Sequence, residues 1–378
     1  MDRFVVDTKP VDTVMARRPG AARTLDVVGG GVIGLTCALA AADAGWRVRV
    51  FDAGRRECAA WVAGGMLGSL GEGLPGEEAL LEMSVASVRR WPDLLRRLDD
   101  STVIAATDSL FVAGSSADAH HLNTLADFVW AHQPGDARLS RVDADAIGDL
   151  ETGLSSRVHS GYLANGEGAV DNRRLLMALE SALVAAGGEV VQARITDLGA
   201  LDADQVLVAA GWGARELCSV PGFHAAKGEI VRMRRTRWSV PPPTRVVRAR
   251  WHARNVYLIP RSDGIVVGAT QYEPQDPDDR TPEVGGVADL LADATDVFPG
   301  LRTYELTEVA AGIRPCTPDG LPLIERIDRR VVAAVGHGRN GILLAPFTSD
   351  AVLGLLSADG SAPASAAAPV SMTTAGGR

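Results

Sequence analysis

The residues most able to do chemistry lie near the N-terminus, in the segment DVVGGGVIGL (26–35). It carries the pattern Gly29-x-Gly31-x-x-Gly34, and Asp52 follows 23 residues after Gly29. In such a pattern the first glycine permits a tight turn, the second lets the backbone approach a pyrophosphate, and the third lets a helix pack closely on a sheet. The helix N-terminus attracts phosphates, and Asp52 can accept hydrogen bonds from a ribose. The spacing predicts a dinucleotide site, which NAD and FAD proteins share.

Three elements must position these residues. We expect a short apolar strand at 25–28, an alanine-rich helix at 32–44 that ends at Gly45, and a second strand at 47–51. This order predicts a βαβ unit whose strands pair in parallel. The glycines then lie at the strand-to-helix turn and Asp52 at the end of the second strand. That context supports the nucleotide prediction better than the glycine pattern alone.

Hydrophobic spacing predicts further elements along the chain. We expect helices at 77–99, 117–131, 171–186 and 284–296, and strands at 109–113, 190–195, 205–209, 227–234, 244–251, 255–260 and 264–270. The last four strands follow one another directly, and the turn 261–264 joins the final pair as a hairpin. They predict an antiparallel sheet in a second domain. Residues 331–356 look like a return to the first domain through a strand, a glycine-rich loop and a helix.

Composition narrows the classes of function. The 378 residues carry a formal net charge of -9, and an acidic chain repels phosphate backbones, so we expect no nucleic-acid partner. No run of eighteen apolar residues occurs, so we expect no membrane segment. The four cysteines form no CxxC pair and lie at no metal-ligand spacing with histidine. This favours a reduced, cytoplasmic protein without a metal.

Several longer segments carry a resemblance to a known family. They are AGGMLG (63–68), KGEI (227–230), YLIPRSDGIVVGAT (257–270), AGIRPCTPDGLPLI (311–324) and GHGRNGILLAP (336–346). Together they resemble the glycine oxidases of the D-amino-acid oxidase family, FAD enzymes that serve thiamine biosynthesis. The resemblance covers most of residues 24–356. It implies an α/β (α+β) fold with a discontinuous Rossmann-type FAD-binding domain and an antiparallel-sheet substrate domain.

The resemblance also implies roles for particular side chains. Arg314 would be the main clamp on the substrate carboxylate, with Arg339 nearby and Tyr257 donating its hydroxyl to the same group. A planar guanidinium fits a carboxylate through two parallel charge-assisted bonds. No catalytic acid or base is required if the amine enters neutral. His337 lies between glycines, where backbone contact with the flavin is favoured over a role as base.

The same resemblance implies a set of flavin contacts in addition to the three fingerprint glycines. They are Val32, Ile33, Asp52, Ala53, Ala59, Ala60, Gly64, Gly65, Met66, Ile195, His337, Gly338, Arg339, Asn340, Gly341, Ile342 and Leu343. The helix that opens at 340–342 would direct its positive end at the reduced flavin. Cys316 does not match the attachment pattern of the covalent flavins in related sarcosine oxidases, so we expect non-covalent FAD. The segment CAAWVAGGML (58–67) lacks the hydroxyl residue usual in this loop, and Gln271 replaces an apolar pocket residue.

These observations predict oxidative deamination of glycine and small amines or amino acids. Hydride transfer to the flavin would give an imine, then glyoxylate and ammonia, with molecular oxygen reduced to hydrogen peroxide. The glyoxylate imine would supply thiazole synthesis for thiamine. The alternatives are a sarcosine or D-amino-acid oxidase or dehydrogenase and a degenerate flavin-binding protein. A homo-oligomer is left open.

The predicted domains alternate along the chain. We assign 24–68, 165–217 and 308–356 to the FAD-binding domain, and 69–164 and 218–307 to the substrate domain. Residues 1–23 read as a flexible extension, and 357–378, rich in Ala, Ser, Pro, Thr and Gly, as a disordered tail.

Overall fold

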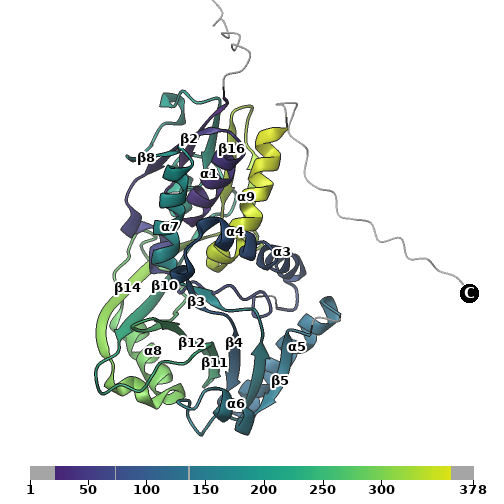
Figure 1. Cartoon of the computed structure of the whole chain (residues 1–378), viewed down its shortest axis with the longest axis vertical. Coiled ribbons are helices and arrows are strands. Elements are labelled where there is room, and N and C mark those ends of the chain that lie inside the picture. Colours follow the sequence, from purple (N-terminus) through teal and green to yellow (C-terminus); the bar gives the residue numbers. More distant parts are fainter. Residues whose placement is uncertain (1–21, 73, 135–136, 359–378) are drawn as a thin grey trace, which may run out of the picture.

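The computed structural model describes residues 22–72, 74–134 and 137–358. The predicted N-terminal extension and C-terminal tail therefore lie almost wholly outside the described residues. Within these ranges, two sheets with their helices form the upper and lower parts of the molecule in Figure 1. The helices are α1 (Val32–Asp43), α2 (Ala59–Val62), α3 (Glu78–Val88), α4 (Trp91–Leu98), α5 (Ser116–His132), α6 (Ala144–Leu150), α7 (Asn172–Ala185), α8 (Val284–Val297) and α9 (Gly341–Ser357).

The upper sheet has six strands and is parallel except at one edge. In spatial order they are β15 (Leu323–Arg326), β16 (Val331–Val335), β9 (Gln205–Val208), β1 (Thr24–Val28), β2 (Arg47–Asp52) and β8 (Glu189–Gln192). α1 packs between α7 and α9, and apolar side chains from these helices and strands form one core. The predicted βαβ unit, β1–α1–β2, is confirmed, with β1 and β2 paired in parallel.

The lower sheet has eight strands. In order they are β14 (Glu305–Cys316), β10 (His224–Arg234), β13 (Gly264–Gly268), β12 (Arg254–Arg261), β11 (Val246–Trp251), β4 (Ser109–Ala113), β6 (Ser160–Ala164) and β5 (Leu139–Asp143). The predicted hairpin β12–β13 is present. The four consecutive strands β10 to β13 pair antiparallel, as predicted. Outside this run, β11 also pairs with β4, and that pairing is parallel. These two strands are far apart in sequence, so no hairpin constrains their directions.

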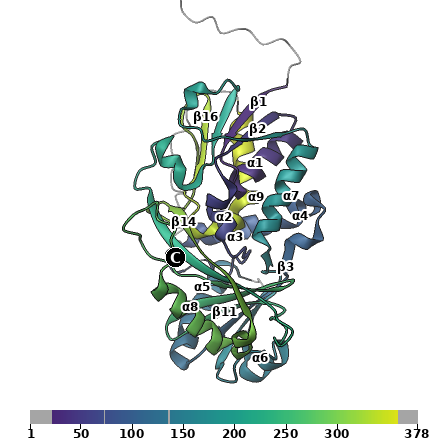
Figure 2. The same ribbon diagram turned by 90° about the vertical axis from the view of Figure 1, so that its left-hand side faces the viewer.

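Side chains alternate between the two faces of this lower sheet, and the faces have different neighbours. One face carries Val231, Leu258 and Val267 and packs against α8 (Figure 2). The opposite face carries Ile230 and Tyr257 and looks toward α2 and the upper sheet. This second face supplies side chains to the site described below.

Two helix predictions show how local chemistry sets element ends. The helix expected at 77–99 is two helices, α3 and α4, because Pro92 lies in the first turn of α4 and its ring excludes a continuous helix through Val88. α7 agrees with prediction. The Asp171 side chain accepts hydrogen bonds from the backbone N–H groups of Arg173 and Arg174, and Gly187 follows with φ +86°.

A short two-stranded sheet, β3 (Ile104–Ala106) with β7 (Ala169–Val170), lies near the junction of the two parts. The predicted domain boundary at residue 308 falls inside β14, which pairs with β10 along the lower sheet. The assignment of residues to domains stays a prediction, and the pairing of β14 favours a boundary after Cys316.

One described helical segment, Gly338–Ser357, is long and apolar enough to cross a membrane by length and composition. More than half of its apolar window is buried inside the molecule, and α9 packs against α1 and α3, as a core helix does.

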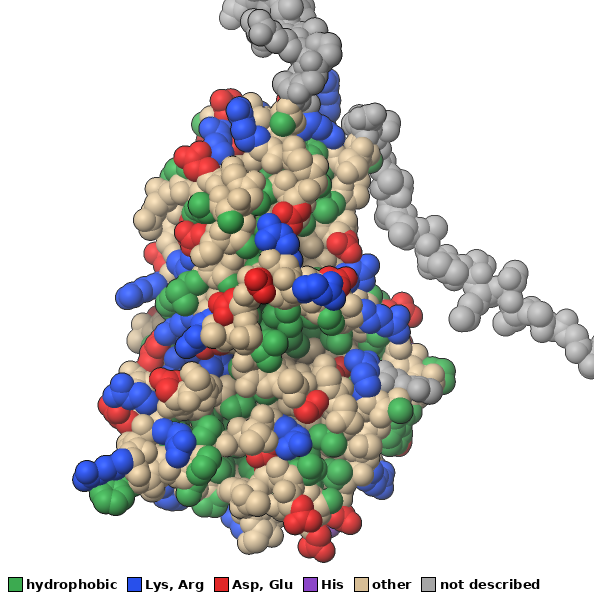
Figure 3. Space-filling model, viewed as in Figure 1, with side chains coloured by type: hydrophobic (Ala, Val, Ile, Leu, Met, Phe, Trp, Pro, Cys, Tyr) green, Lys and Arg blue, Asp and Glu red, His purple; other side chains and the backbone are tan. Residues whose placement is uncertain are grey.

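On the face shown in Figure 3, basic and acidic side chains are interspersed.

Candidate active site

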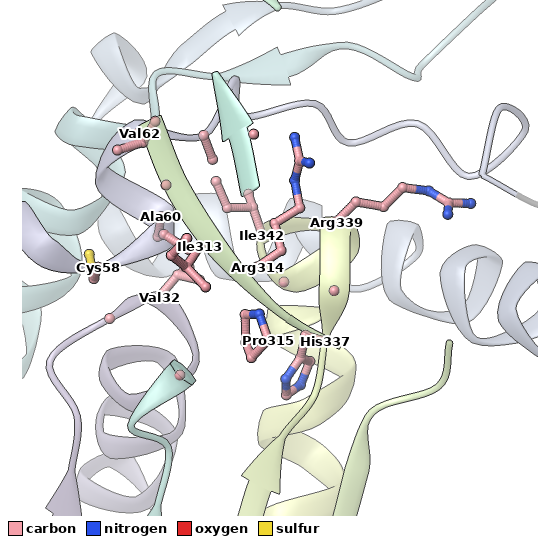
Figure 4. Close-up of a pocket in the computed structure, with 18 of the residues that line it drawn as sticks. Val32, Cys58, Ala60, Val62, Ile313, Arg314, Pro315, His337, Arg339 and Ile342 are labelled. Carbon is pink, nitrogen blue, oxygen red and sulfur yellow. The ribbon is translucent and has the colours of Figure 1, made fainter. Parts of the chain in front are cut away.

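A cavity of about 1020 Å³ opens at the junction of the two parts and is lined by residues of both. Almost every residue singled out from the sequence lies on its wall (Figure 4). The lining includes Gly29, Gly31, Val32, Ile33, Asp52, Ala53, Ala59, Ala60, Gly64, Gly65, Met66, Ile195, Tyr257, Arg314 and the run 337–343. Gly34 is the exception: it does not line the cavity, because it packs against the glycine turn instead.

The glycines of the fingerprint form the turn between β1 and α1. Gly29 has φ +123°, and its N–H donates to the Phe51 carbonyl at 2.9 Å. A Cβ on Gly34 would lie 1.8 Å from the Gly29 carbonyl oxygen, so only glycine lets α1 approach the turn. Gly34 thus has the packing role that the spacing predicts, while Gly29 and Gly31 face the cavity.

Asp52 ends β2 beside this turn. Its Oδ1 accepts from the Gly54 N–H at 3.0 Å, and its Oδ2 lies 3.5 Å from Arg55 Nη2. A Cβ on Gly30 would lie 2.5 Å from the Asp52 side chain, so the carboxylate rests directly against the glycine turn. Such a placement suits the acceptance of ribose hydroxyls, as the fingerprint predicts.

The C-terminal loop of the cavity leads into α9. α9 begins at Gly341, and Asn340 to Leu343 line the cavity, so the positive end of this 17-residue helix lies at the wall. His337 is buried, and its Nε2 lies 2.9 Å from Thr348 Oγ1. Burial lowers the pKa of His337 to about 3, so the imidazole is neutral. This geometry fits a structural histidine, and the predicted backbone contact of His337 with the flavin stays a prediction.

Arg314 projects from β14 toward the cavity (Figure 4). Its Nη1 donates to the Thr270 carbonyl at 3.2 Å. A Cβ on Gly228 would lie 2.3 Å from Nη2, so the guanidinium lies flat on this glycine of β10. Among the described residues, no carboxylate pairs with Arg314 within 4.0 Å. The cavity wall therefore holds a cation that no carboxylate of the described residues pairs with.

Tyr257 lies on β12, next to Arg248 of β11 in the sheet. A Cβ on Gly268 would lie 2.5 Å from its hydroxyl, so glycine is required beside the phenol. Burial raises the pKa of Tyr257, which keeps the hydroxyl protonated and able to donate a hydrogen bond. Arg314 and Tyr257 thus supply a cation and a donor to the same cavity.

Arg339 differs from Arg314, although both line the cavity. Its Nε is 2.9 Å from Glu72 Oε2, and its Nη2 is 3.2 Å from Glu77 Oε2. Figure 4 shows the Arg314 and Arg339 side chains pointing in different directions. Two carboxylates already balance the charge of Arg339, and its predicted contact with the substrate carboxylate stays a prediction.

Glu72 and Arg248 line the cavity and were not singled out from the sequence. Arg248 Nη2 lies 2.8 Å from Glu72 Oε1, so Glu72 joins Arg248 of the lower sheet to Arg339 before α9. Burial alone would raise the pKa of Glu72, but the two arginines outweigh it and hold that pKa below its usual range. Glu72 follows a glycine-rich segment without periodicity, so no local signal marked it.

Thiol chemistry and metal chemistry have little support in this cavity. Cys58 lines the cavity, and burial raises the pKa of its thiol to about 11, which keeps it neutral and unreactive. Cys316 is also a free cysteine, and burial is the main cause of the raised pKa of its thiol. Across the part of the chain that the structure describes, no cluster of His, Cys, Asp and Glu could hold a metal.

Fold and cavity together define a two-part nucleotide-binding oxidoreductase, and the comparisons agree. The family model described as "FAD dependent oxidoreductase" (DAO) matches residues 26–354. This chain belongs to that family of FAD-dependent oxidoreductases. The residues present fit FAD, because the glycine turn and Asp52 suit its adenosine diphosphate and the remaining cavity extends to Arg314.

Individual relatives are similar over most of the chain. The "Putative thiamine biosynthesis oxidoreductase ThiO" of Rhizobium etli is 30% identical, over 85% of this chain and 92% of that protein. The crystal structure of glycine oxidase from Geobacillus kaustophilus matches with a TM-score of 0.77 and 28% identity, covering 89% of this chain and 95% of that one. The "Bifunctional protein ThiO/ThiG" of Synechocystis sp. is 29% identical over 87% of this chain. The chain spans about half of that bifunctional relative, 51% of its length.

Proposed function

We propose that this protein catalyses the FAD-dependent oxidative deamination of glycine and other small amino acids. The observation that carries the proposal is Arg314, a cavity-lining guanidinium with no carboxylate partner among the described residues. A free guanidinium next to a protonated tyrosine suits a substrate carboxylate, which it can hold through charge-assisted hydrogen bonds. Similarity to proteins named glycine oxidase supports the substrate class.

In this mechanism the protein binds and orients the substrate. Arg314 and Tyr257 hold the carboxylate and thereby fix the α-carbon, which removes much of the entropic barrier to reaction. The glycine turn and Asp52 would hold FAD, which would supply the redox chemistry: acceptance of a hydride from the α-carbon and transfer of the electrons to molecular oxygen. The positive end of α9 stabilises negative charge that develops near it. His337 is a weak base because burial lowers its pKa to about 3, so this mechanism assigns it no proton transfer and takes the substrate amine in its unprotonated form.

The products of this reaction are the imine or its hydrolysis products, glyoxylate and ammonia, together with hydrogen peroxide. The name of the Rhizobium relative supports a place in thiamine biosynthesis, where the imine would serve thiazole synthesis. The four free cysteines support a reducing, cytoplasmic setting. We expect the FAD to be bound without a covalent link.

The decisive experiment adds substrates anaerobically to the purified yellow protein. Glycine, sarcosine and D-alanine are mixed with it separately, and the loss of flavin absorbance is followed in a stopped-flow instrument. We expect glycine to bleach the flavin with the highest ratio of rate to half-saturating concentration. Faster bleaching by sarcosine or D-alanine would reassign the substrate within the family, and no bleaching by any of the three would overturn the proposal.

A further inference from the structure

The wall of the cavity that runs from Cys58 to Met66, here called the cofactor loop (residues 58–66), contains no serine or threonine. It therefore offers a bound cofactor no hydroxyl group, only backbone groups and apolar side chains. Figure 4 shows Ala60 and Val62 of this loop at the cavity. How the loop backbone is oriented must then decide how well the cofactor binds.

Hydrogen-bond donors behind the loop hold its carbonyl groups. Asn172 Nδ2 donates to the Ala60 carbonyl at 2.7 Å and to the Trp61 carbonyl at 2.9 Å. Arg261 Nη2 donates to the Gly64 carbonyl at 2.7 Å. The Trp61 carbonyl also accepts from Arg173 Nε at 3.2 Å and from Arg232 Nη2 at 3.4 Å.

These donors form one connected cluster. The Oδ1 atom of Asn172 accepts from Arg232 Nη2 at 3.2 Å and from Arg261 Nη2 at 3.4 Å, which fixes which way the amide faces. Asn172 is fully buried, and Arg261 is also buried. The four donor residues come from the start of α7 and from β10 and β12, so the upper and lower parts of the molecule meet here.

None of the four donor side chains is among the described residues that line the cavity. Ala60 and Gly64, whose carbonyls they bind, do line it. The carbonyl oxygens of these residues therefore face away from the cavity, which spares an anionic cofactor the repulsion of carbonyl dipoles. Among the described residues, the three arginines have two carboxylates within 4.0 Å, Asp171 and Glu308, so cations outnumber carboxylates at this distance behind the loop.

Burying several cations close together is costly. The Nε atoms of Arg232 and Arg261 are buried and make no hydrogen bond to a described residue, although each lies within ion-pair distance of a carboxylate. In some proteins, buried ionic groups fix a specific geometry that apolar packing would leave undefined. A set of loop carbonyls that must point in one direction is such a case.

We propose that Asn172, Arg232 and Arg261 are positioning residues for FAD, and that they act by turning the carbonyl groups of the cofactor loop away from the cavity. The backbone of the cofactor loop takes the place of the missing hydroxyl contacts. The three side chains fix the orientation of that backbone from the side opposite the cavity. This concerns FAD binding alone and does not depend on glycine being the substrate.

The test compares three variants in an FAD titration of the full-length apoprotein, followed by flavin fluorescence and by the visible circular dichroism of the bound flavin. Asn172→Asp keeps the size of the side chain and still accepts from both arginines, but it cannot donate to Ala60 and Trp61. An acid at the first position of α7 is also favourable for that helix, so the helix is retained. Arg261→Gln shortens the donor to Gly64. Arg174→Ala, on the same helix turn but without a contact to the loop, is the control.

We expect FAD to bind about tenfold to a hundredfold more weakly to Asn172→Asp and to Arg261→Gln, since each loses one or two buried hydrogen bonds. Their flavin circular dichroism should change, while Arg174→Ala should bind FAD within about threefold of wild type. If Asn172→Asp does not fold, Arg261→Gln decides by the same criterion. FAD binding in both variants equal to that of the control, with an unchanged flavin spectrum, would overturn the proposal.

Discussion

The two ends of the cavity differ in the chain segments that form them and in the groups that they present. At the nucleotide end, a glycine turn, one carboxylate and the N-terminus of α1 come from a single contiguous stretch, residues 24–52. At the substrate end, Arg314, Tyr257 and Gly228 come from three strands that are far apart in sequence. The first end uses backbone geometry, whereas the second uses charged and polar side chains on a sheet. Changes at the two ends should therefore affect different measurements.

The largest effect is expected at the substrate end. Arg314→Ala removes the unpaired guanidinium, which costs about 3–6 kcal/mol of charge-assisted bonding to a carboxylate. We expect kcat/KM for glycine to fall roughly a hundredfold to ten-thousandfold, with FAD content unchanged. Arg314→Lys should recover only part of the loss, because a point charge cannot reproduce two parallel bonds. Steady-state oxidation with flavin occupancy checked by absorbance measures both, and wild-type kcat/KM at full occupancy in Arg314→Ala would contradict the assignment.

The second effect is expected at the nucleotide end and should show the opposite pattern. Asp52→Ala removes the acceptor beside the glycine turn, and a hydrogen bond to a charged group contributes about 1.5–3 kcal/mol. FAD should bind roughly tenfold to a hundredfold more weakly, while kcat at saturating FAD stays close to wild type. Titration of the apoprotein with FAD measures this. Unchanged affinity would show that Asp52 does not bind the ribose.

Glu72 joins the lower sheet to the segment before α9 through Arg248 and Arg339, so its replacement should change stability first. Glu72→Gln removes the charge that pairs with Arg248 and Arg339, and we expect a loss of about 1–2 kcal/mol at pH 7. The pKa of Glu72 is lower in the folded state than in the unfolded state. The stabilisation is therefore complete above pH ~4.3, the pKa of the unfolded state, and is lost as the pH falls through the pKa of the folded state. Urea unfolding of both proteins between pH 3 and 7 should show curves that converge at the acid end. A constant difference would contradict the lowered pKa.

The smallest effect is expected for His337. Because its pKa is already depressed to about 3, its charge does not change in the range where the enzyme is assayed. In His337→Gln the pH dependence of kcat/KM between pH 5 and 9 should keep its shape, with a change of less than about tenfold in magnitude. Loss of an ionisation near neutral pH in this variant would reveal a base that the geometry does not indicate.

Much of the fold could be predicted because its signals are local. The cap of α7 at Asp171 and the turn of the β12–β13 hairpin depend on residues within a few positions of one another, and the βαβ unit lies within the single stretch 24–52. The break between α3 and α4 carried a local signal as well, at Pro92. The parallel pairing of β4 with β11 did not, because strand direction across a long connection depends on the path of the whole chain.

The candidate site likewise has one part that local sequence signals determine and another that only the tertiary structure decides. The sequence by itself determined the glycine turn and Asp52, because a single βαβ unit, residues 24–52, positions both. It also provided Arg314, Tyr257 and the residues before α9 through resemblance. Only the tertiary structure decided that Arg339 is paired with Glu72, that Arg248 shares this carboxylate, and that Asn172 holds the cofactor loop. Those partners are more than 100 residues apart, and charge in a sequence does not reveal which opposite charge it will meet.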